Sequence, residues 1–224
     1  MLSGRATGHL GRALRALLIA SGLWLMASAA QAQLRIVAVG DSSFRGGPSM
    51  RDPQDAFPAR LEYALRQKGY NVTVSNEGVN GELSWQTQRR LDSAVPSGTQ
   101  IALVATGGND IVRGFASRTA AIANLKDIAT TLHARGVAVL VFRIGSEVMP
   151  PDQFAAETRA LQVPGVVLLP PMQAGGLVSR NELHVEGYRQ PGTTLWHLNR
   201  EGNDIVVQRI LPEIEKIIAR LPRP

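Results

Sequence analysis

The sequence predicts an α/β fold in which a parallel β-sheet is covered by helices on both faces. Short apolar runs alternate with stretches of helical periodicity, and these runs are too continuous for a sheet with one face in water. The 224 residues are 44% apolar and 19% charged, which is typical of a globular protein. We find no internal repeat, and the length suits one domain after a short N-terminal segment.

Five apolar segments are expected to form the strands of the sheet. The first, 34–39, ends at Gly40 and is typical of a buried parallel strand. The others are 71–75, 101–105, 137–144 and 166–169. Because helical segments separate them, the strands should all run in the same direction.

Helices are predicted wherever apolar residues recur at a spacing of three or four. The last helix begins near Asn199 and has one apolar stripe, which consists of Ile205, Val206, Ile210, Ile214 and Ile217. The other predicted helices cover 56–68, 84–91, 117–134 and 154–161. The stretch 170–198 carries several Gly and Pro residues and is expected to be a long loop.

Residues 1–32 are expected to be an export signal, and residues 33–224 the folded domain. Three arginines precede a 12-residue apolar core at 16–27, and the small residues of Ala30-Gln31-Ala32 fit a cleavage site. An uncleaved membrane anchor is the alternative, but the core is shorter than the ~18 apolar residues of a membrane-spanning helix. We therefore expect a periplasmic or secreted protein with no stable membrane span after cleavage.

The charge and the cysteine count exclude several classes of protein. The net charge of +6 falls to +3 without residues 1–32, which hold three arginines and no acidic residue. The remaining basic residues are scattered, whereas a nucleic-acid-binding protein usually gathers them on one face, so we expect no nucleic-acid partner. The chain has no cysteine, which excludes disulfides, thiolate metal sites and a cysteine nucleophile.

Four polar segments follow the predicted strands at the ends where parallel α/β sheets bind ligands. Residues 40–43 follow the first strand, 76–81 the second and 107–110 the third, and the loop with His184 and His197 follows the fifth. Because the carboxyl ends of parallel strands meet at one edge, we expect these segments to converge.

Ser42 is the candidate nucleophile at this edge. A serine hydroxyl becomes reactive only with a base to take its proton and donors to hold the oxyanion. Gly81 has no side chain, so its N–H can approach an oxyanion closely, and Asn109 offers a side-chain amide. Each of these residues also has an ordinary structural interpretation. Asp41 or Ser42 could cap the next segment, Gly81 could permit a turn, and Asn109 could brace a loop. Their joint occurrence at the ends of three strands favours a catalytic site.

The base should be one of the three histidines in residues 33–224. His133 lies at the opposite edge of the sheet and is expected to be a surface residue. His197 directly precedes the C-terminal helix, whereas His184 lies in the middle of the loop with no element to hold it. Because a catalytic base needs rigid support, His197 is favoured over His184.

Together these residues resemble the four sequence blocks of the SGNH (GDSL-type) hydrolase family. The blocks are Gly40-Asp41-Ser42, Gly81, Gly107-Gly108-Asn109-Asp110 and His197. The sequence is most similar to the periplasmic thioesterase I/lysophospholipase type, especially at 107–115. The resemblance implies a flavodoxin-like three-layer α/β/α sandwich with a five-stranded parallel sheet. It also implies Ser42 as nucleophile, His197 as base, and an oxyanion hole made by the N–H groups of Ser42 and Gly81 and the amide of Asn109, with no cofactor and no metal.

One position departs from the family pattern, which carries an Asp three residues before the histidine. Here that residue is Thr194, and disabling the acid of a catalytic triad can cost ~10⁴ in turnover. A backbone carbonyl could hold the imidazole instead, or the fourth block could be 181–184 with His184 as base, which puts Asn at the acid position. An acid from elsewhere could also substitute, and the candidates are Glu186, Glu182 and Glu201.

The expected function is that of an exported serine esterase or acyl hydrolase that cleaves an ester or thioester through an acyl-enzyme. The resemblance implies a small-molecule, lipid or acylated-glycan substrate without selecting among them. Residues 45–48 and 170–198 should shape the pocket, and Trp85 and Trp196 either line an apolar groove or pack in the core. One alternative is a catalytically weak or inactive SGNH-fold protein that binds acyl or glycan ligands, because of Thr194. A flavodoxin-like cofactor-binding protein is the other, but no Gly-x-Gly-x-x-Gly follows the first strand.

Overall fold

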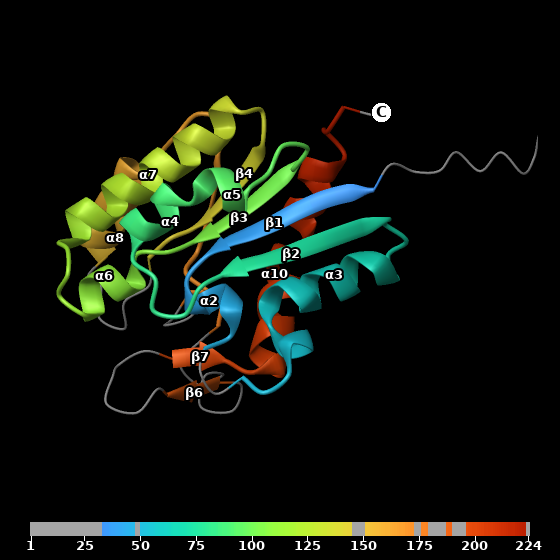
Figure 1. The fold of residues 1–224 in the computed structure, drawn as a ribbon, viewed down its shortest axis with the longest axis horizontal. Helices are drawn as coiled ribbons and strands as arrows, with labels where there is room; N and C mark the ends of the chain where they lie inside the picture. The colour runs from blue at the N-terminus through green and yellow to red at the C-terminus, as the bar shows by residue number, and fades with distance from the viewer. Residues whose placement is uncertain are drawn as a thin grey trace, which may run out of the picture. The chain divides into compact units, whose positions relative to one another are not determined.

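The computed structural model describes residues 33–47, 50–144, 151–172, 176–178, 187–189 and 196–222. Its centre is a parallel sheet of five strands in the order β2-β1-β3-β4-β5 (Figure 1). The strands are β1 (Leu34–Gly40), β2 (Val72–Gly78), β3 (Ile101–Ala105), β4 (Ala138–Phe142) and β5 (Val167–Leu169). All five predicted strands are confirmed, and their order is that of a doubly wound, flavodoxin-like sheet. The predicted export signal, 1–32, lies outside the described residues.

Helices cover both faces of this sheet (Figure 1). One face is covered by α3 (Phe57–Gln67) and α10 (Arg200–Ile218), and the other by α4 (Ser84–Arg89), α5 (Leu91–Ala94), α7 (Arg118–Ala134) and α8 (Pro151–Ala160). In β1, Ile36 and Ala38 belong to the core under α3 and α10, whereas Val37 and Val39 belong to the core on the opposite face. This alternation buries the sheet from both sides, which confirms the predicted three-layer α/β/α fold.

Three phenylalanines from different elements meet under the carboxyl edge of the sheet. Phe44 lies in α2 (Ser42–Arg45), and its ring centroid is 5.5 Å from that of Phe57 and 5.9 Å from that of Phe142. None of the three is more than 2% exposed. A helix of four residues is not stable by itself in water, so the packing of Phe44 in this cluster holds α2 in place.

The structure corrects the sequence predictions at the carboxyl edge. β2 runs to Gly78, so Asn76 lies within the strand and does not follow it. The Asn76 side chain donates to the carbonyl of Phe44 at 2.9 Å. This hydrogen bond satisfies its polar amide within the sheet. Residues 42–45 form helix α2 where the sequence suggested only a turn, and α6 (Gly108–Val112) begins within the predicted loop 107–110.

The predicted loop 170–198 contains two short strands. β6 (Gly187–Arg189) and β7 (Trp196–Leu198) pair in antiparallel fashion and form a separate two-stranded sheet. A three-residue strand is too short to show alternation in a sequence, which explains why both were missed. A 3₁₀ turn, η1 (Pro53–Asp55), precedes α3.

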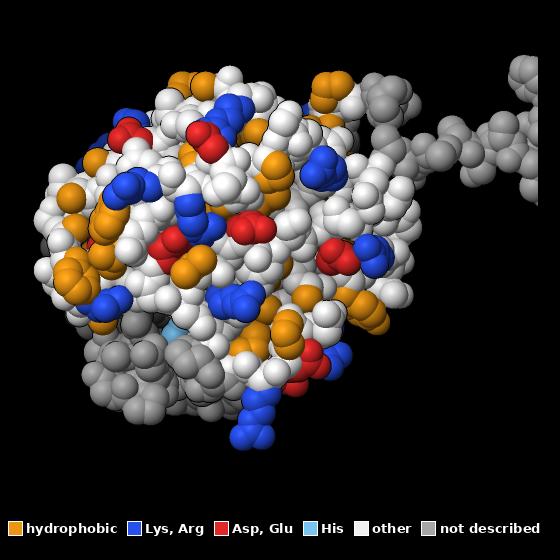
Figure 2. All heavy atoms as spheres, viewed as in Figure 1, with side chains coloured by type: hydrophobic (Ala, Val, Ile, Leu, Met, Phe, Trp, Pro, Cys, Tyr) orange, Lys and Arg blue, Asp and Glu red, His pale blue; other side chains and the backbone are white. Residues whose placement is uncertain are grey.

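The C-terminal helix α10 begins at the predicted cap. The Asn199 side chain accepts a hydrogen bond from the N–H of Gly202 at 2.9 Å, as N-cap residues do. The helix packs against α3, and an ion pair of 2.6 Å joins Arg60 to Asp204. None of the helices in the described ranges is long and apolar enough to cross a membrane. On the face shown in Figure 2, basic and acidic side chains are interspersed over the surface.

Candidate active site

Ser42 lies at the point where β1 ends and the chain turns into α2. A Cβ atom on Gly40 would lie 1.8 Å from the carbonyl oxygen of Ala105, and φ of Gly40 is +152°, so only glycine fits here. The Asp41 N–H donates to the same carbonyl at 2.9 Å, which fixes the turn against β3. Ser42 is the first residue of α2 and is partly exposed, so its hydroxyl and its N–H lie at the carboxyl edge of the sheet.

The Asp41 carboxylate caps α2. Its Oδ1 accepts a hydrogen bond from the N–H of Ser43 at 2.8 Å, so the ordinary capping role predicted for this residue is confirmed. Burial raises the pKa of Asp41 to about 6, and the nearby charges of Glu82 and Asp110 add to the shift, whereas the Ser43 hydrogen bonds oppose it. Asp41 therefore supports the position of Ser42 from below the edge.

Gly81 lies in a tight turn that follows β2. The N–H of Glu82 donates to the carbonyl of Val79 at 3.2 Å, and Gly81 has φ of +76°, a conformation that favours glycine. The Val79 N–H donates to the carbonyl of Gly40 at 2.9 Å, which attaches the turn to the end of β1. Val79 lies two residues before Gly81, and Gly40 lies two residues before Ser42. The hydrogen bond between Val79 and Gly40 therefore links the Gly81 turn to the segment that carries Ser42.

Asn109 lies in the first turn of α6, after β3. Its side chain is 5% exposed, and its Nδ2 donates one hydrogen bond, of 3.0 Å, to the carbonyl of Glu82. The second hydrogen of that amide remains for another acceptor. At the start of α6, Gly107 has φ of +102°, and a Cβ there would lie 2.7 Å from the side chain of Ile144. Gly107 therefore lets the chain turn sharply into α6, where the Asn109 side chain reaches the carbonyl of Glu82 beside Gly81.

His197 lies in β7, which contacts both α2 and α10. In the β6-β7 pair it lies opposite Tyr188, and only 3% of its surface is exposed. Burial lowers the pKa of His197, so the imidazole is held in the neutral form that a base requires. A paired strand and the capped start of α10 thus flank this histidine, which agrees with the expectation that it has rigid support.

Several other predicted site residues lie outside the described residues. These are Thr194, Glu186, Glu182 and His184, as well as Pro48. Glu201 is an exposed residue in the first turn of α10. Trp85 is 42% exposed on α4, with the Arg89 guanidinium 5.8 Å from its ring centroid, so it does not belong to the core. His133 is exposed, as predicted.

Sequence reasoning missed a buried polar network behind the site. Glu82 is 6% exposed, and its carboxylate accepts two hydrogen bonds of 2.6 Å from Arg90. Asp110 is fully buried, and its carboxylate accepts from the N–H of Ser84 at 2.8 Å and from the Ser84 hydroxyl at 2.6 Å. An acid directly after Gly81, with an arginine eight residues later on a predicted helix, was the available signal.

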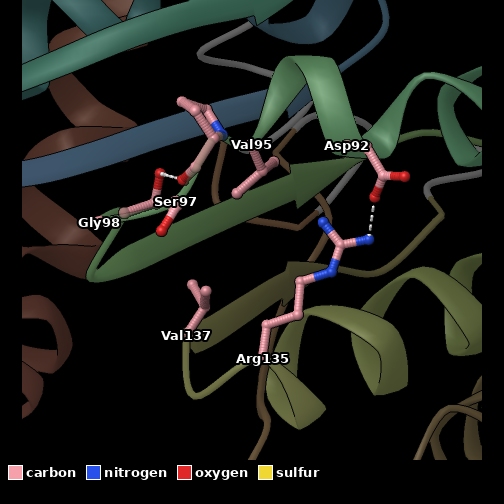
Figure 3. Close-up of a pocket in the computed structure, with 8 residues that line it drawn as sticks. Asp92, Val95, Ser97, Gly98, Arg135 and Val137 are labelled. Atoms are coloured by element: carbon pink, nitrogen blue, oxygen red, sulfur yellow. Dashed lines mark hydrogen bonds and ion pairs between the residues drawn. The ribbon is translucent and has the colours of Figure 1, made fainter.

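A cavity of about 380 Å³ lies at the opposite edge of the sheet (Figure 3). It is lined at the amino ends of β3 and β4 by Asp92, Val95, Ser97, Gly98, Arg135 and Val137, among others. Asp92 and Arg135 form an ion pair at its rim. The cavity is therefore separate from the Ser42 edge. Within the described ranges, no group of three His, Asp or Glu residues could hold a metal ion.

Fold and site together define a class of protein: a three-layer α/β domain with a serine, a turn glycine, an asparagine and a histidine around one sheet edge. The family model of the GDSL-like lipase/acylhydrolase family matches residues 38–205, so the chain belongs to this family. The predicted resemblance is thereby confirmed.

Individual relatives are more distant. The chain is 27% identical over 120 residues to an arylesterase of Vibrio mimicus, and the match covers 53% of this chain and 58% of that protein. The structure is similar to the psychrotrophic esterase EstA from Pseudoalteromonas sp., with a TM-score of 0.66, 17% identity, and coverage of 83% of this chain and 99% of EstA. It is also similar to AlinE4, an SGNH-hydrolase family esterase, with a TM-score of 0.56, 25% identity, and coverage of 85% and 98%.

Proposed function

We propose that the protein is an exported serine esterase that cleaves an ester or thioester through an acyl-enzyme. Membership of the lipase/acylhydrolase family supports this reaction class. The assignment of residues rests on one observation. Hydrogen bonds link the Gly81 turn to the end of β1, before α2, and to Asn109 in α6, and β7 contacts α2. Nucleophile, oxyanion donors and base are the parts that acyl transfer needs in one place.

In the proposed mechanism, His197 takes the proton of the Ser42 hydroxyl while that oxygen attacks the carbonyl carbon of the substrate. The negative charge that develops on the carbonyl oxygen is stabilised by the N–H groups of Ser42 and Gly81 and by the Asn109 amide. Each donor of this kind is worth about 10²–10³ in turnover in comparable sites. His197 then gives its proton to the leaving group, which departs and leaves the acyl group on Ser42. In the second half, His197 takes a proton from a water molecule as that water attacks the acyl carbon. His197 returns the proton to the Ser42 oxygen as the carboxylic acid is released.

The export signal at 1–32 supports a periplasmic or secreted location. An exported protein whose N-terminus is Gln33 would agree with this proposal, and a chain that retains residues 1–32 in the cytoplasm would contradict it. The arylesterase relative favours aryl esters as first substrates to test. Lipid esters and acylated glycans are the other substrate classes of this proposal.

The test is hydrolysis of p-nitrophenyl esters of increasing acyl length by the purified protein. Ser42→Ala should abolish turnover, and Ser97→Ala is the matched control because it removes an exposed serine hydroxyl at the opposite edge of the sheet. Turnover that survives in folded Ser42→Ala would refute the assignment. A folded wild-type protein that hydrolyses no ester would instead favour the ligand-binding alternative, which rests on Thr194 at the usual acid position.

A further inference from the structure

We propose that Glu82 and Arg90 are positioning residues that hold all three oxyanion donors in register. This inference rests on the proposed function and extends it to residues that never contact the substrate. Glu82 is 6% exposed, and Thr87 beside it is fully buried. Both lie behind the edge that carries Ser42, Gly81 and Asn109.

The backbone of Glu82 borders two of the donors directly. Its carbonyl accepts the 3.0 Å hydrogen bond from the Asn109 amide, which fixes the rotation of that side chain. Its N–H closes the turn that presents Gly81, through the 3.2 Å bond to Val79. A displacement of Glu82 therefore moves both donors together.

The Glu82 side chain fixes this backbone by an ion pair with Arg90. The Nε and Nη2 atoms of Arg90 each donate to one oxygen of the carboxylate at 2.6 Å, which is the two-pronged geometry that arginine forms with carboxylates. The Thr87 hydroxyl donates to the same carboxylate at 2.8 Å. The hydrogen bonds to Glu82 raise the pKa of Arg90, so the guanidinium remains charged.

Arg90 extends this network to the nucleophile. Its Nη2 also donates to the carbonyl of Glu77 at 2.7 Å and, through a hydrogen that two acceptors share, to that of Gly40 at 3.3 Å. Gly40 lies two residues before Ser42, so the guanidinium joins the end of β2 to the turn that positions the Ser42 N–H.

The third strand end is linked through two threonines. The hydroxyl oxygens of Thr87 and Thr106 are 3.2 Å apart, and Thr106 directly precedes the glycine pair that leads to Asn109. The Thr87 hydroxyl has one hydrogen, which it donates to Glu82. In the contact between the two threonines, Thr106 is therefore the donor and Thr87 the acceptor. All three strand ends with a proposed oxyanion donor are therefore connected to one carboxylate.

The pair also has an electrostatic consequence. An unpaired carboxylate behind the oxyanion hole would repel the negative charge that develops in the transition state. Arg90 compensates that charge, and it does so in a buried environment where charges interact strongly. Loss of the Arg90 charge should therefore weaken the binding of the transition state more than that of the substrate. Loss of the Glu82 charge leaves no carboxylate to repel the oxyanion, so Glu82→Gln lowers turnover only by displacing the donors.

The experiment compares Glu82→Gln and Arg90→Lys with wild type in ester hydrolysis. Glu82→Gln preserves the shape of the side chain and removes its charge, and Arg90→Lys preserves the charge and removes the two-pronged contact. We expect kcat to fall about 10- to 100-fold in Glu82→Gln and KM to change less than about threefold, as expected for slightly misplaced catalytic groups. The matched control is Glu213→Gln, which removes a carboxylate from an exposed ion pair with Lys216 and should leave both constants unchanged.

A double-mutant cycle with Asn109→Ala separates positioning from a general structural role. Asn109 is one of the three donors that Glu82 positions, so Glu82→Gln should lower kcat less in the Asn109→Ala background than in wild type, while the Ser42 and Gly81 donors keep part of the effect. Equal losses in both backgrounds, or a folded Glu82→Gln enzyme with kcat within threefold of wild type, would overturn the inference. Should Glu82→Gln fail to fold, Arg90→Lys is read in the same cycle. Absence of Ser42-dependent turnover in wild type would refute the proposed function itself, which is a separate result.

Discussion

Replacement of Phe44 by alanine should destabilise the protein strongly, although the residue lies in a helix of four residues. Phe44 is fully buried between Phe57 and Phe142, with ring centroids at 5.5 and 5.9 Å. Removal of a buried phenylalanine side chain costs about 3–5 kcal/mol in the free energy of unfolding. For a domain of this size, 1 kcal/mol corresponds to about 2–4 °C in Tm, so we expect Tm to fall by roughly 10 °C.

The matched control is Phe115→Ala. The Phe115 ring is 62% exposed and contacts the Arg113 guanidinium at 4.9 Å, so its loss should cost less than about 1 kcal/mol. Both variants are measured by thermal denaturation at one protein concentration. Equal shifts in Tm for the two variants would refute the reasoning that the aromatic cluster fixes α2. At 20 °C, Phe44→Ala should also have a reduced kcat, because α2 carries Ser42.

Two predictions concern pH. The folded pKa of Asp41 is about 6 instead of 3.8, so the protein loses stability relative to Asp41→Asn as pH rises from 4 to above 6, by about 3 kcal/mol in all. Urea denaturation of both proteins at several pH values measures this difference, and parallel curves would contradict it. Burial lowers the pKa of His197 from 6.5, so kcat/KM should rise with pH at a midpoint below 6.5 and stay level above it. The same midpoint in Asp41→Asn assigns it to the histidine, whereas a midpoint above 6.5 would contradict the assignment.

The fold was predictable because its strongest sequence signals coincide with its deepest burial. β3 is buried at all five of its residues, and its run of apolar side chains follows directly from cover on both faces. The apolar stripe of α10 likewise marks the face that packs on the sheet. The missed elements, α2, α6, β6 and β7, are three to five residues long, so their position depends on contacts with distant segments and not on a local pattern.

The site was predictable in its parts but not in its support. Glycines at 40, 81 and 107 have positive φ and mark turns, and they identify the strand ends where Ser42 and Asn109 lie. The burial of Glu82 was harder to predict from the acid and the arginine eight residues later, because an acid next to a turn is most often a solvated surface residue. Only the folded chain brings Arg90 and Thr87 around its carboxylate.

The arrangement of the layers has a consequence for synthesis, because the parts of the proposed site are made far apart in time. Ser42 follows the first strand, whereas His197 lies far along the chain, shortly before α10. α10 covers α3 through the Arg60–Asp204 ion pair and closes the core that contains Leu61 and Leu65. A chain that stops before β7 therefore lacks the proposed base and leaves this core open to water. The segment from β7 to α10 thus brings the proposed base and the cover of this core together.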